Sequence, residues 1–302
     1  MTLVAIGACY LDTILTICRR RGGNCPNTLE VLGQLLQYGP SSAESSLNLI
    51  TVLPSKTSVA SQQIQASLGN KVRLDSCIYR EIFSEPASSY IITSQATGSR
   101  TIVNYNELPE MTCAEFATAV ESLLAVTGRP WFHFEGRAPD VTLECIRYLR
   151  EHFLGTEISV EVEKPGRPGL QELADAADVV IYSKGWAQSN GYTSAEDCLR
   201  DQSLKTSRAS LLCCTWGHEG AAAFEPKTGN FAHVPAHIEE GGVIDTIGAG
   251  DTFNAGLLYG LIYRGQDWGF RKRLEFANLI AGLKVTREGF SDLQRALDVP
   301  SY

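Results

Sequence analysis

The residues best suited to chemistry stand together in one run, Val243–Gly256. This run is predicted to leave a strand, turn at Gly248, Ala249 and Gly250, and enter an apolar helix directly after Asp251. Glycine lets the backbone adopt unusual angles and approach a ligand closely. Backbone N–H groups at a helix N-terminus attract anions. The pattern therefore predicts an anion-binding turn with a carboxylate beside it.

The carboxylate of Asp251 stands where it could act on a phosphoryl group held by that turn. A carboxylate there can accept the proton of an attacking hydroxyl, an effect worth about 10²–10⁴-fold in rate. The amides of residues 248–251 would stabilise the charge of the transferring group. In the alternative interpretation Asp251 only caps a helix and the glycines only form a turn. The length of the string D-T-I-G-A-G-D-T-F favours the catalytic interpretation.

A second glycine turn, at residues 22–23, precedes another predicted helix. Asn24 can cap this helix, and Pro26 suits its first turn. Four leucines then fall on one face, and a glycine-proline pair at residues 39–40 ends the helix. The chain therefore carries two glycine turns that each open a helix.

Strand and helix patterns alternate along the rest of the chain. Buried strands are predicted at Leu3–Ile6, Leu47–Leu53, Ser89–Thr93, Trp131–Glu135, Ile158–Val162, Asp178–Tyr182 and Leu211–Thr215. Helices are predicted at Ala114–Val126, Val141–Phe153 and Leu170–Ala176. This alternation predicts an α/β fold in three layers, with a mostly parallel central sheet and helices on both faces. Such sheets bind ligands at the carboxyl ends of their strands. No repeat or linker divides the chain, so residues 1–302 are predicted to form a single domain.

The bulk composition is that of an ordinary globular protein, with 44% hydrophobic and 20% charged residues. A net charge of −8 argues against a nucleic-acid partner, which needs a basic surface. The nine cysteines have no metal-binding spacing, which predicts reduced thiols in a cytoplasmic protein. The apolar N-terminal stretch lacks the basic start of a signal peptide and is interrupted by Asp12. No stretch reaches 18 apolar residues, so no membrane span is expected.

Five motifs resemble those of the PfkB/ribokinase family of small-molecule kinases, and its ketohexokinase branch most closely. In chain order they are Gly22–Asn27, Ser99–Val103, His133–Arg137, Ser159–Pro165 and Asp245–Asn254. Only the first position of the second motif differs, where serine replaces asparagine. The resemblance implies a ribokinase-like fold and an ATP-dependent sugar kinase, with Mg²⁺ as cofactor and K⁺ as a candidate. The implied substrate is a ketohexose such as fructose, with another sugar or a nucleoside as the alternative.

The resemblance also implies a role for each matching residue. The sugar-binding residues would be Asp12, Gly23, Asn24, Asn27 and Asp251, since carboxylates and amides suit the hydroxyls of a polyol. The ATP-binding residues would be Arg100, Gly217, His218, Glu219 and Gly220. The phosphate-binding turn would be Gly248, Ala249, Gly250 and Asp251, with Asp251 as the catalytic base. The metal ligands are not implied.

Several of these residues also have simpler interpretations. Asn24 could be only a helix cap, Asp12 a solvated residue at a strand end, and Arg100 a surface charge. Glu163 and Lys164 form either a structural ion pair or part of the phosphate site.

Other nucleotide enzymes lack their defining motifs in this chain. There is no G-x-x-x-x-G-K-[ST] phosphate loop, and no G-x-G-x-x-G follows the first strand. The protein-kinase motifs H-R-D and D-F-G are also absent.

The chain departs from the family pattern between Asp12 and Gly22. Only Thr13–Arg21, nine residues, lie there, where the resemblance implies a longer insert that builds strands of a lid over the sugar. Nine residues span about 30 Å when extended but cannot form that hairpin. We therefore expect a truncated β lid, which argues against the homodimer that the resemblance implies. A catalytically impaired homologue that binds sugar or nucleotide stays an alternative, because closure excludes water from the transfer.

Overall fold

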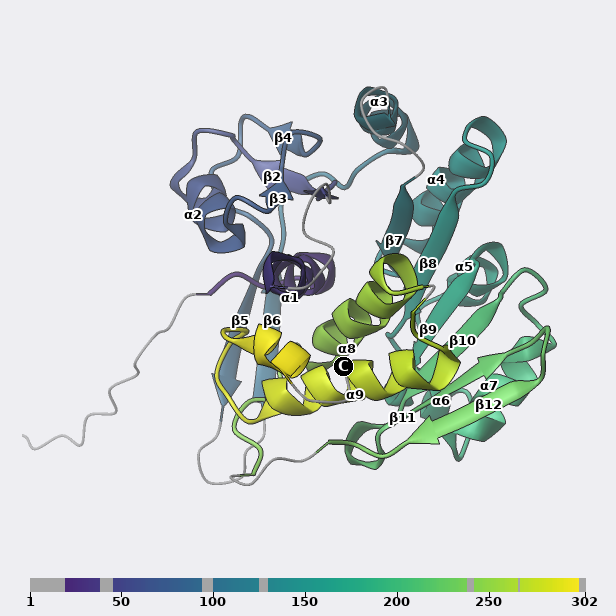
Figure 1. Ribbon diagram of the computed structural model, residues 1–302. Helices are drawn as coiled ribbons and strands as arrows, with labels where there is room; N and C mark the ends of the chain where they lie inside the picture. Colours follow the sequence, from purple (N-terminus) through teal and green to yellow (C-terminus); the bar gives the residue numbers. More distant parts are fainter. Residues whose placement is uncertain are drawn as a thin grey trace, which may run out of the picture.

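The computed structural model describes residues 20–38, 46–93, 100–124, 130–237, 242–265 and 267–298. A six-stranded sheet forms its centre (Figure 1). The strand order is β12-β11-β10-β9-β8-β7. The strands are β7 Trp131–Glu135, β8 Glu157–Val162, β9 Val179–Ser183, β10 Leu211–Thr215, β11 Ala221–Glu225 and β12 Asn230–Val234. Strands β7 to β10 are parallel, and β11 and β12 continue the sheet in antiparallel pairing.

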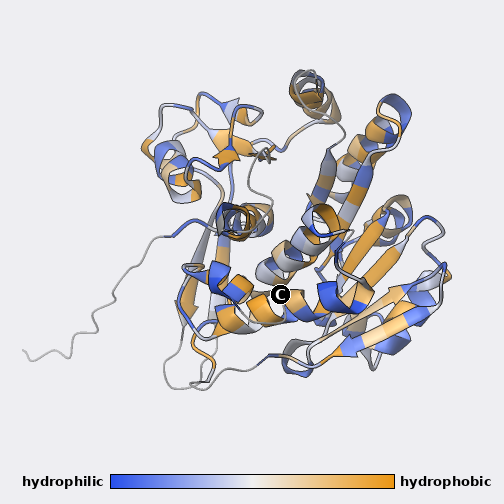
Figure 2. Ribbon diagram, viewed as in Figure 1, coloured by the Kyte–Doolittle hydropathy of each residue, from blue (hydrophilic) through white to orange (hydrophobic). Residues whose placement is uncertain are grey.

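Helices cover both faces of this sheet. One face carries α1 Asn24–Tyr38, α8 Ala249–Leu258 and α9 Phe270–Val285. The other carries α3 Cys113–Leu124, α4 Pro139–His152, α5 Leu170–Ala176, α6 Lys184–Ser189 and α7 Ala195–Ser203. Because side chains alternate along a strand, Val179 and Ile181 pack towards α8 and α9, whereas Val180 and Tyr182 pack towards the opposite helices. Figure 2 shows the apolar colour of these buried strands. The predicted three-layer α/β fold is confirmed.

A smaller part packs around α1 and α2 Val59–Leu68. It contains two parallel strand pairs, β1 Leu47–Asn48 with β3 Val72–Arg73, and β2 Val52–Pro54 with β4 Ile78–Arg80. The single strand predicted at Leu47–Leu53 is therefore wrong in extent. The segment divides because its two ends pair with different partners.

An antiparallel ribbon of two strands, β5 Ser88–Thr93 and β6 Arg100–Tyr105, stands apart from the central sheet (Figure 1). Large apolar side chains along it are exposed, among them Tyr90, Ile92 and Val103. The ribbon has two strands in the part of the chain that the structure describes. Most of the short segment between Asp12 and Gly22, on which the truncated lid was predicted, lies outside the described residues.

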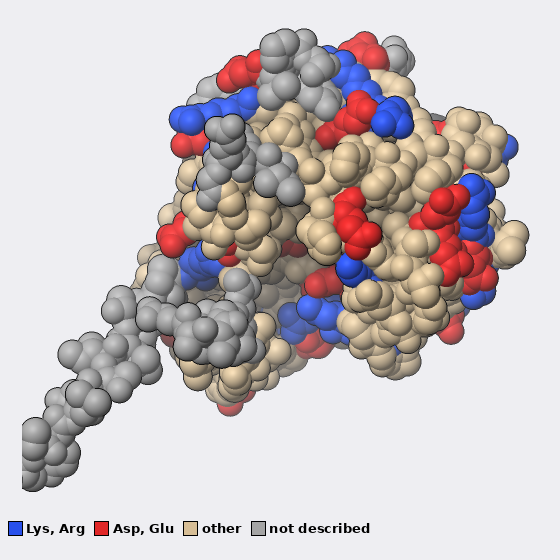
Figure 3. Space-filling view, turned by 90° about the horizontal axis from the view of Figure 1, so that it is seen from below, with Lys and Arg blue, Asp and Glu red and all other residues tan. Residues whose placement is uncertain are grey.

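Shorter helices complete the description. They are η1 Gly217–Glu219, η2 Tyr259–Tyr263, which is a π-helix, and η3 Leu293–Asp298. The strand predicted to lead into the glycine run at Val243 is wrong, because residues 242–248 form bends and turns. They are held instead by hydrogen bonds from the amides of Ile244 and Asp245 to the carbonyl of Val285. Within the described residues, no helix is both long and apolar enough to span a membrane. Acidic and basic side chains are mixed on the face in Figure 3, without a continuous basic surface on that face.

Candidate active site

The glycine turn that opens α8 is locked in place by its own backbone. Gly248 caps the helix in the left-handed region, with φ 81°. A Cβ at this position would come within 2.5 Å of Phe290 Cε1. Both the backbone N–H and the hydroxyl of Thr252 donate to the Gly248 carbonyl, at 2.9 and 2.8 Å. Only glycine can therefore hold the turn in this shape.

The first turn of α8 offers N–H groups to an anion. Ala249, Gly250 and Asp251 are its first three residues, and N–H groups at these positions have no acceptor within the helix. The Ala249 amide donates to Thr246 at 3.3 Å, so it is already occupied. A Cβ on Gly250 would have no heavy atom within 4 Å, which means that space is open beside it. The turn therefore has the form of the predicted anion site.

The carboxylate of Asp251 is buried and held by α1. Asn27 Nδ2 donates to Asp251 Oδ2 at 2.7 Å, and Arg21 Nη1 donates to Asn27 Oδ1 at 2.8 Å. Arg21 also pairs with Glu30. The guanidinium therefore fixes which way the Asn27 amide points, and that amide fixes one oxygen of the carboxylate.

Burial is the main reason why the pKa of Asp251 rises, to about 8. The hydrogen bond from Asn27 opposes this rise, and the negative charges of Glu161, Glu163 and Glu135 add to it. A carboxylate with a pKa near the working pH is a far stronger base than an ordinary aspartate. The environment of Asp251 therefore suits proton abstraction.

Asn24 bridges two carboxylates at the carboxyl end of β8. Its Nδ2 donates to Glu161 Oε2 at 2.7 Å and to Glu163 Oε2 at 2.9 Å. Asn24 and Asn27 lie one helical turn apart on α1, so both face the same edge of the sheet. The structure therefore brings together Asn24, Asn27 and Asp251, three of the predicted sugar-binding residues. Gly23 precedes them with φ 102°.

Glu135 and His133 on β7 and Glu161 on β8 also lie at this edge of the site. Burial, followed by the charge of Glu161, raises the pKa of Glu135. His133 Nε2 lies 2.9 Å from Glu161 Oε1. The interpretation by residue types missed Glu135, Glu161 and His133 as site residues. The signal was present, since all three belong to the motifs H-F-E-G-R and S-V-E-V-E-K-P.

Glu163 forms the ion pair that the sequence suggested, whereas its role near the phosphates stays a prediction. Its Oε1 pairs with Lys164 Nζ at 3.1 Å, while its Oε2 accepts from Asn24. The ion pair is exposed, and exposed pairs contribute about 0–1 kcal/mol to stability. Glu163 therefore belongs to the site through its second oxygen.

Asp245 anchors the segment that leads into the glycine turn. Its Oδ2 lies 3.1 Å from the fully buried Lys284 ammonium and 3.1 Å from Arg20, and its Oδ1 accepts from the Ile247 amide at 2.9 Å. Partial burial alone would raise the pKa of Asp245, but the hydrogen bonds from Ile247, Lys284 and Arg20 lower it to about 2. Asp245 is therefore ionised and structural.

The predicted nucleotide loop follows β10 and meets the end of β9. Gly217, His218 and Glu219 form η1 and are exposed, while Gly220 is buried against the backbone of Val234. Glu219 Oε1 lies 3.3 Å from the ammonium of Lys184, the first residue after β9.

The ammonium of Lys184 also stands 5.3 Å from the centroid of the Trp216 ring, which is itself part of the core. The loop thus lies at the same edge of the sheet as the carboxylates of β7 and β8, because the carboxyl ends of parallel strands share one edge.

Two predicted residues cannot be placed at the site. Asp12 lies outside the described residues, and Arg100 begins β6 but its side chain is outside the described part.

Comparison with known proteins gives the same family and fold. The family model described as pfkB family carbohydrate kinase matches residues 21–296. Ketohexokinase from Mus musculus is 32% identical over 212 residues, which cover 68% of this chain and 67% of that protein. This agrees with the family and the branch that the motifs predicted.

Three solved structures show the extent of the similarity in fold. Ribokinase from Giardia lamblia has a TM-score of 0.71 at 18% identity, covering 92% of this chain and 87% of that chain. Ribokinase from Arabidopsis thaliana, complexed with ribose and ATP, has a TM-score of 0.67 at 17% identity, with 92% and 86% covered. The nucleoside kinase from Burkholderia thailandensis, in complex with inosine, has a TM-score of 0.64 at 18% identity, with 97% and 91% covered. These structures confirm the predicted ribokinase-like fold.

Proposed function

Because the chain belongs to the pfkB family of carbohydrate kinases and is thus a phosphotransferase acting on a sugar hydroxyl, we propose that it transfers the γ-phosphoryl group of ATP to a ketohexose such as fructose. One observation carries the assignment of the site. A buried carboxylate, Asp251, stands beside the N-terminus of α8 and accepts a hydrogen bond from Asn27 on α1. This arrangement supports Asp251 as a base that lies between an anion-binding turn and amides suited to sugar hydroxyls.

Proton abstraction is the task of Asp251 in this proposal. The carboxylate removes the proton of the attacking hydroxyl as the bond to phosphorus forms, and its raised pKa makes it basic enough to hold that proton. The Asn27 amide keeps one carboxylate oxygen in place, so the other oxygen is the one that meets the acceptor. Arg21 holds the Asn27 amide in the orientation that donates.

The turn from Gly248 to Asp251 binds the phosphoryl oxygens in this proposal. Its free N–H groups stabilise the charge that spreads over those oxygens during transfer. Asn24 binds sugar hydroxyls together with Glu161 and Glu163, with which it already shares hydrogen bonds. We assign Asp12 and Gly23 to the same subsite.

We assign nucleotide binding to η1, with Gly217, His218, Glu219 and Gly220, and to Arg100. The Giardia and Arabidopsis structures share the fold, and the Arabidopsis enzyme was solved with ribose and ATP. A ribokinase from Escherichia coli was solved with ATP and Mg²⁺.

The acidic edge of the sheet fits Mg²⁺ as cofactor. Burial first, and then the charges of neighbouring carboxylates, raise the pKa values of Glu135 and Asp251. A cation would offset those charges, and Mg²⁺ prefers such oxygen donors. When bound with ATP, Mg²⁺ supplies charge neutralisation of the phosphates. We propose Glu163 as the carboxylate that faces it. K⁺ is a candidate second cation.

The whole chain, residues 1–302, is proposed to act as one kinase domain in the cytoplasm. The seven cysteines in the described part of the chain are all unpaired, which suits a reducing compartment. Because only nine residues lie between Asp12 and Gly22, we propose that the lid is truncated and that the homodimer implied by the family resemblance is weakened or lost.

The test is direct detection of product by mass spectrometry. Purified protein is incubated with ATP, Mg²⁺ and, one at a time, fructose, ribose and inosine, with the Asp251→Asn variant as the matched control. We expect a hexose phosphate from fructose, and at least about 100-fold less from the variant. Product only from ribose or inosine would reassign the substrate within the family. Binding of ATP and fructose without any phosphorylated product would favour the impaired homologue, which the short segment between Asp12 and Gly22 makes the second candidate.

A further inference from the structure

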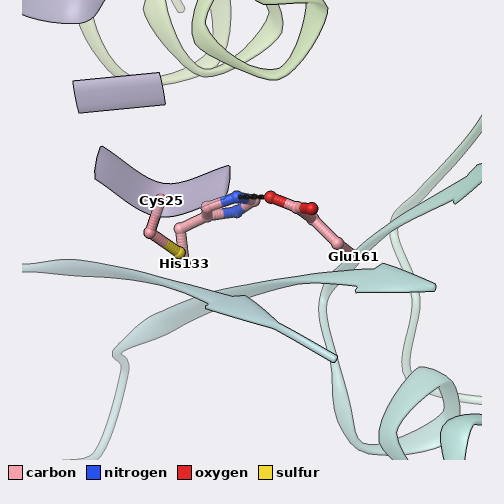
Figure 4. A group of neighbouring side chains, drawn as sticks. All are labelled: Cys25, His133 and Glu161. Atoms are coloured by element: carbon pink, nitrogen blue, oxygen red, sulfur yellow. Dashed lines mark hydrogen bonds and ion pairs between the residues drawn. The ribbon is translucent and has the colours of Figure 1, made fainter. Parts of the chain in front are cut away.

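Three side chains with metal-binding atoms converge beneath the first turn of α1 (Figure 4). Cys25 comes from α1, His133 from β7 and Glu161 from β8. Their ligand atoms all lie within 4.8 Å of one another. Cys25 and His133 are half-buried, and Glu161 is buried. Neither the phosphoryl transfer nor the sugar subsite uses the thiol or the imidazole.

We propose that Cys25, His133 and Glu161 form a binding site for one thiophilic divalent cation, with Zn²⁺ as the best fit. Thiolate sulfur, imidazole nitrogen and carboxylate oxygen are the three donor types that Zn²⁺ takes in proteins. The sulfur donor selects against Mg²⁺ and Ca²⁺, which take oxygen ligands. Three protein ligands leave the fourth tetrahedral position to water or to a bound ligand.

The distances require small side-chain movements. Ligand atoms about 2.0–2.3 Å from a tetrahedral Zn²⁺ ion lie about 3.3–3.7 Å from one another. The pair His133 Nε2 and Glu161 Oε1, now at 2.9 Å, must open by about half an ångström. The Cys25 sulfur, at most 4.8 Å from the other two ligand atoms, needs to come closer by no more than about 1.5 Å.

Hydrogen bonds around His133 prepare its Nε2 to bind a cation. Ser159 Oγ lies 2.8 Å from His133 Nδ1. It also accepts from Trp131 Nε1 at 2.8 Å and can donate to the Phe132 carbonyl at 3.4 Å. When Ser159 donates to Phe132, His133 donates its Nδ1 proton to Ser159; when Ser159 donates to Nδ1 instead, Nε2 carries the proton and donates to Glu161 Oε1. In either case Nε2 and Glu161 Oε1 face each other at 2.9 Å, and a metal ion would take the place of a proton between them.

The other carboxylate oxygen of Glu161 accepts a hydrogen bond from a residue outside the cluster. Asn24 Nδ2 donates to Oε2 at 2.7 Å, which leaves Oε1 for the cation. Metal-binding histidines and carboxylates are commonly oriented by such outer hydrogen bonds. Hydrogen bonds from Ser159 and Asn24 therefore already orient two of the three ligands.

The charges that face the thiol favour a cation. Glu135 and Asp251 face it in addition to Glu161, and Glu163 lies on the far side of the Asn24 amide. Burial is the first reason why the pKa of Cys25 is raised, and Glu161, Glu135 and Asp251 raise it further, against a hydrogen bond from the Glu135 backbone. A cation reverses the effect of these charges. Binding must release the thiol proton, so we expect the affinity for metal to increase with pH.

The experiment uses Co²⁺ as a spectroscopic substitute for Zn²⁺ on the full chain. Addition of one equivalent of Co²⁺ to reduced protein should produce a thiolate-to-cobalt charge-transfer band and the visible bands of a tetrahedral ion, and Zn²⁺ should remove both. Zn²⁺ should also raise the midpoint of thermal unfolding, because it binds only the folded chain. Cys25→Ser should remove the charge-transfer band. Cys77→Ser should retain it, because Cys77 is another half-buried free cysteine that contacts Leu49 instead.

A chromophoric chelator in competition measures the affinity for Zn²⁺. Loss of one outer hydrogen bond in a metal site costs about 10–100-fold in affinity, so loss of the direct ligand in Cys25→Ser or His133→Gln should cost more than about 100-fold. Circular dichroism of each variant establishes that it is folded. The proposal is overturned if wild-type protein gives no charge-transfer band, a result that depends on no variant. It is equally overturned if folded Cys25→Ser keeps the band, because the thiolate then belongs to another cysteine.

Discussion

Replacement of Asp251 by asparagine should stabilise the protein while it removes the activity. The folded state holds a proton on Asp251 because burial and nearby carboxylates raise its pKa from 3.8 to about 8. The unfolded chain releases that proton at its ordinary pKa. The raised pKa of Asp251 therefore lowers the free energy of unfolding. This loss is absent below about pH 4 and grows as the pH rises towards 8. Asparagine has no proton to lose, and its amide oxygen can still accept from Asn27.

The size of the effect follows from the difference in pKa. About four pKa units at about 1.4 kcal/mol each give an upper limit of 5–6 kcal/mol above pH 8. Because protein and water relax around an ionised carboxylate, we expect a measured gain of about 2–3 kcal/mol. Urea unfolding of both proteins at about pH 4.5 and pH 8.5 measures it. The stability of Asp251→Asn relative to wild type should increase between the two pH values.

The control for this measurement is Asp140→Asn. Asp140 also lies in the first turn of a helix, α4, but it is exposed, so its substitution should leave the difference between the two pH values unchanged. Turnover of Asp251→Asn should fall by about 10²–10⁴-fold, with ATP binding kept within a few-fold. Two results would refute the reasoning. Retained turnover would show that Asp251 is not the base, and a stability difference independent of pH would show that it is not a buried neutral acid.

Three further predictions concern the same segment. Gly248→Ala should abolish turnover and lower the free energy of unfolding by more than about 1 kcal/mol, because the new Cβ meets Phe290 and the φ of residue 248 is positive. The control is Gly250→Ala, which has open space at its Cβ and should unfold at the same urea concentration as wild type. Asp245→Asn should destabilise by about 3–5 kcal/mol at neutral pH, since it leaves the Lys284 ammonium buried without a counter-charge. In wild type this contribution is complete above about pH 4 and is lost as the pH falls through the lowered pKa of about 2, which acid unfolding of both proteins tests. The kcat/KM of wild type should rise tenfold per pH unit up to about pH 8 and then level off; a flat profile between pH 6 and 8 would contradict the raised pKa of the base.

The sequence predicted those parts of the site that depend on local pattern. The turn at Gly248 and the helix after it follow from glycine conformation and apolar spacing, and the three-layer sheet follows from the alternation of strands and helices. The strand predicted over Leu47–Leu53 was wrong because strand pairing is decided by partners distant in sequence. For the same reason the contact of Asn24 with Glu161 and Glu163 could not be read from residue types alone. The roles given to Asp12 and Arg100 stay predictions.

Cysteine spacing also failed to indicate the cluster at Cys25. Metal sites are recognised in sequence when their ligands lie a few residues apart. Here one ligand comes from a helix and two from neighbouring strands, so only the packing of α1 against the sheet brings them together.

The position of α1 links two events that are usually considered separately. Asn24 and Asn27 are one turn apart on this helix. Asn24 donates to Glu161 at the end of β8, and Asn27 donates to Asp251. A movement of α1 that separates Asn24 from Glu161 and Glu163 would also displace Asn27 relative to Asp251. In the proposed function, sugar binding at Asn24 and alignment of the base at Asp251 would both depend on the position of this one helix.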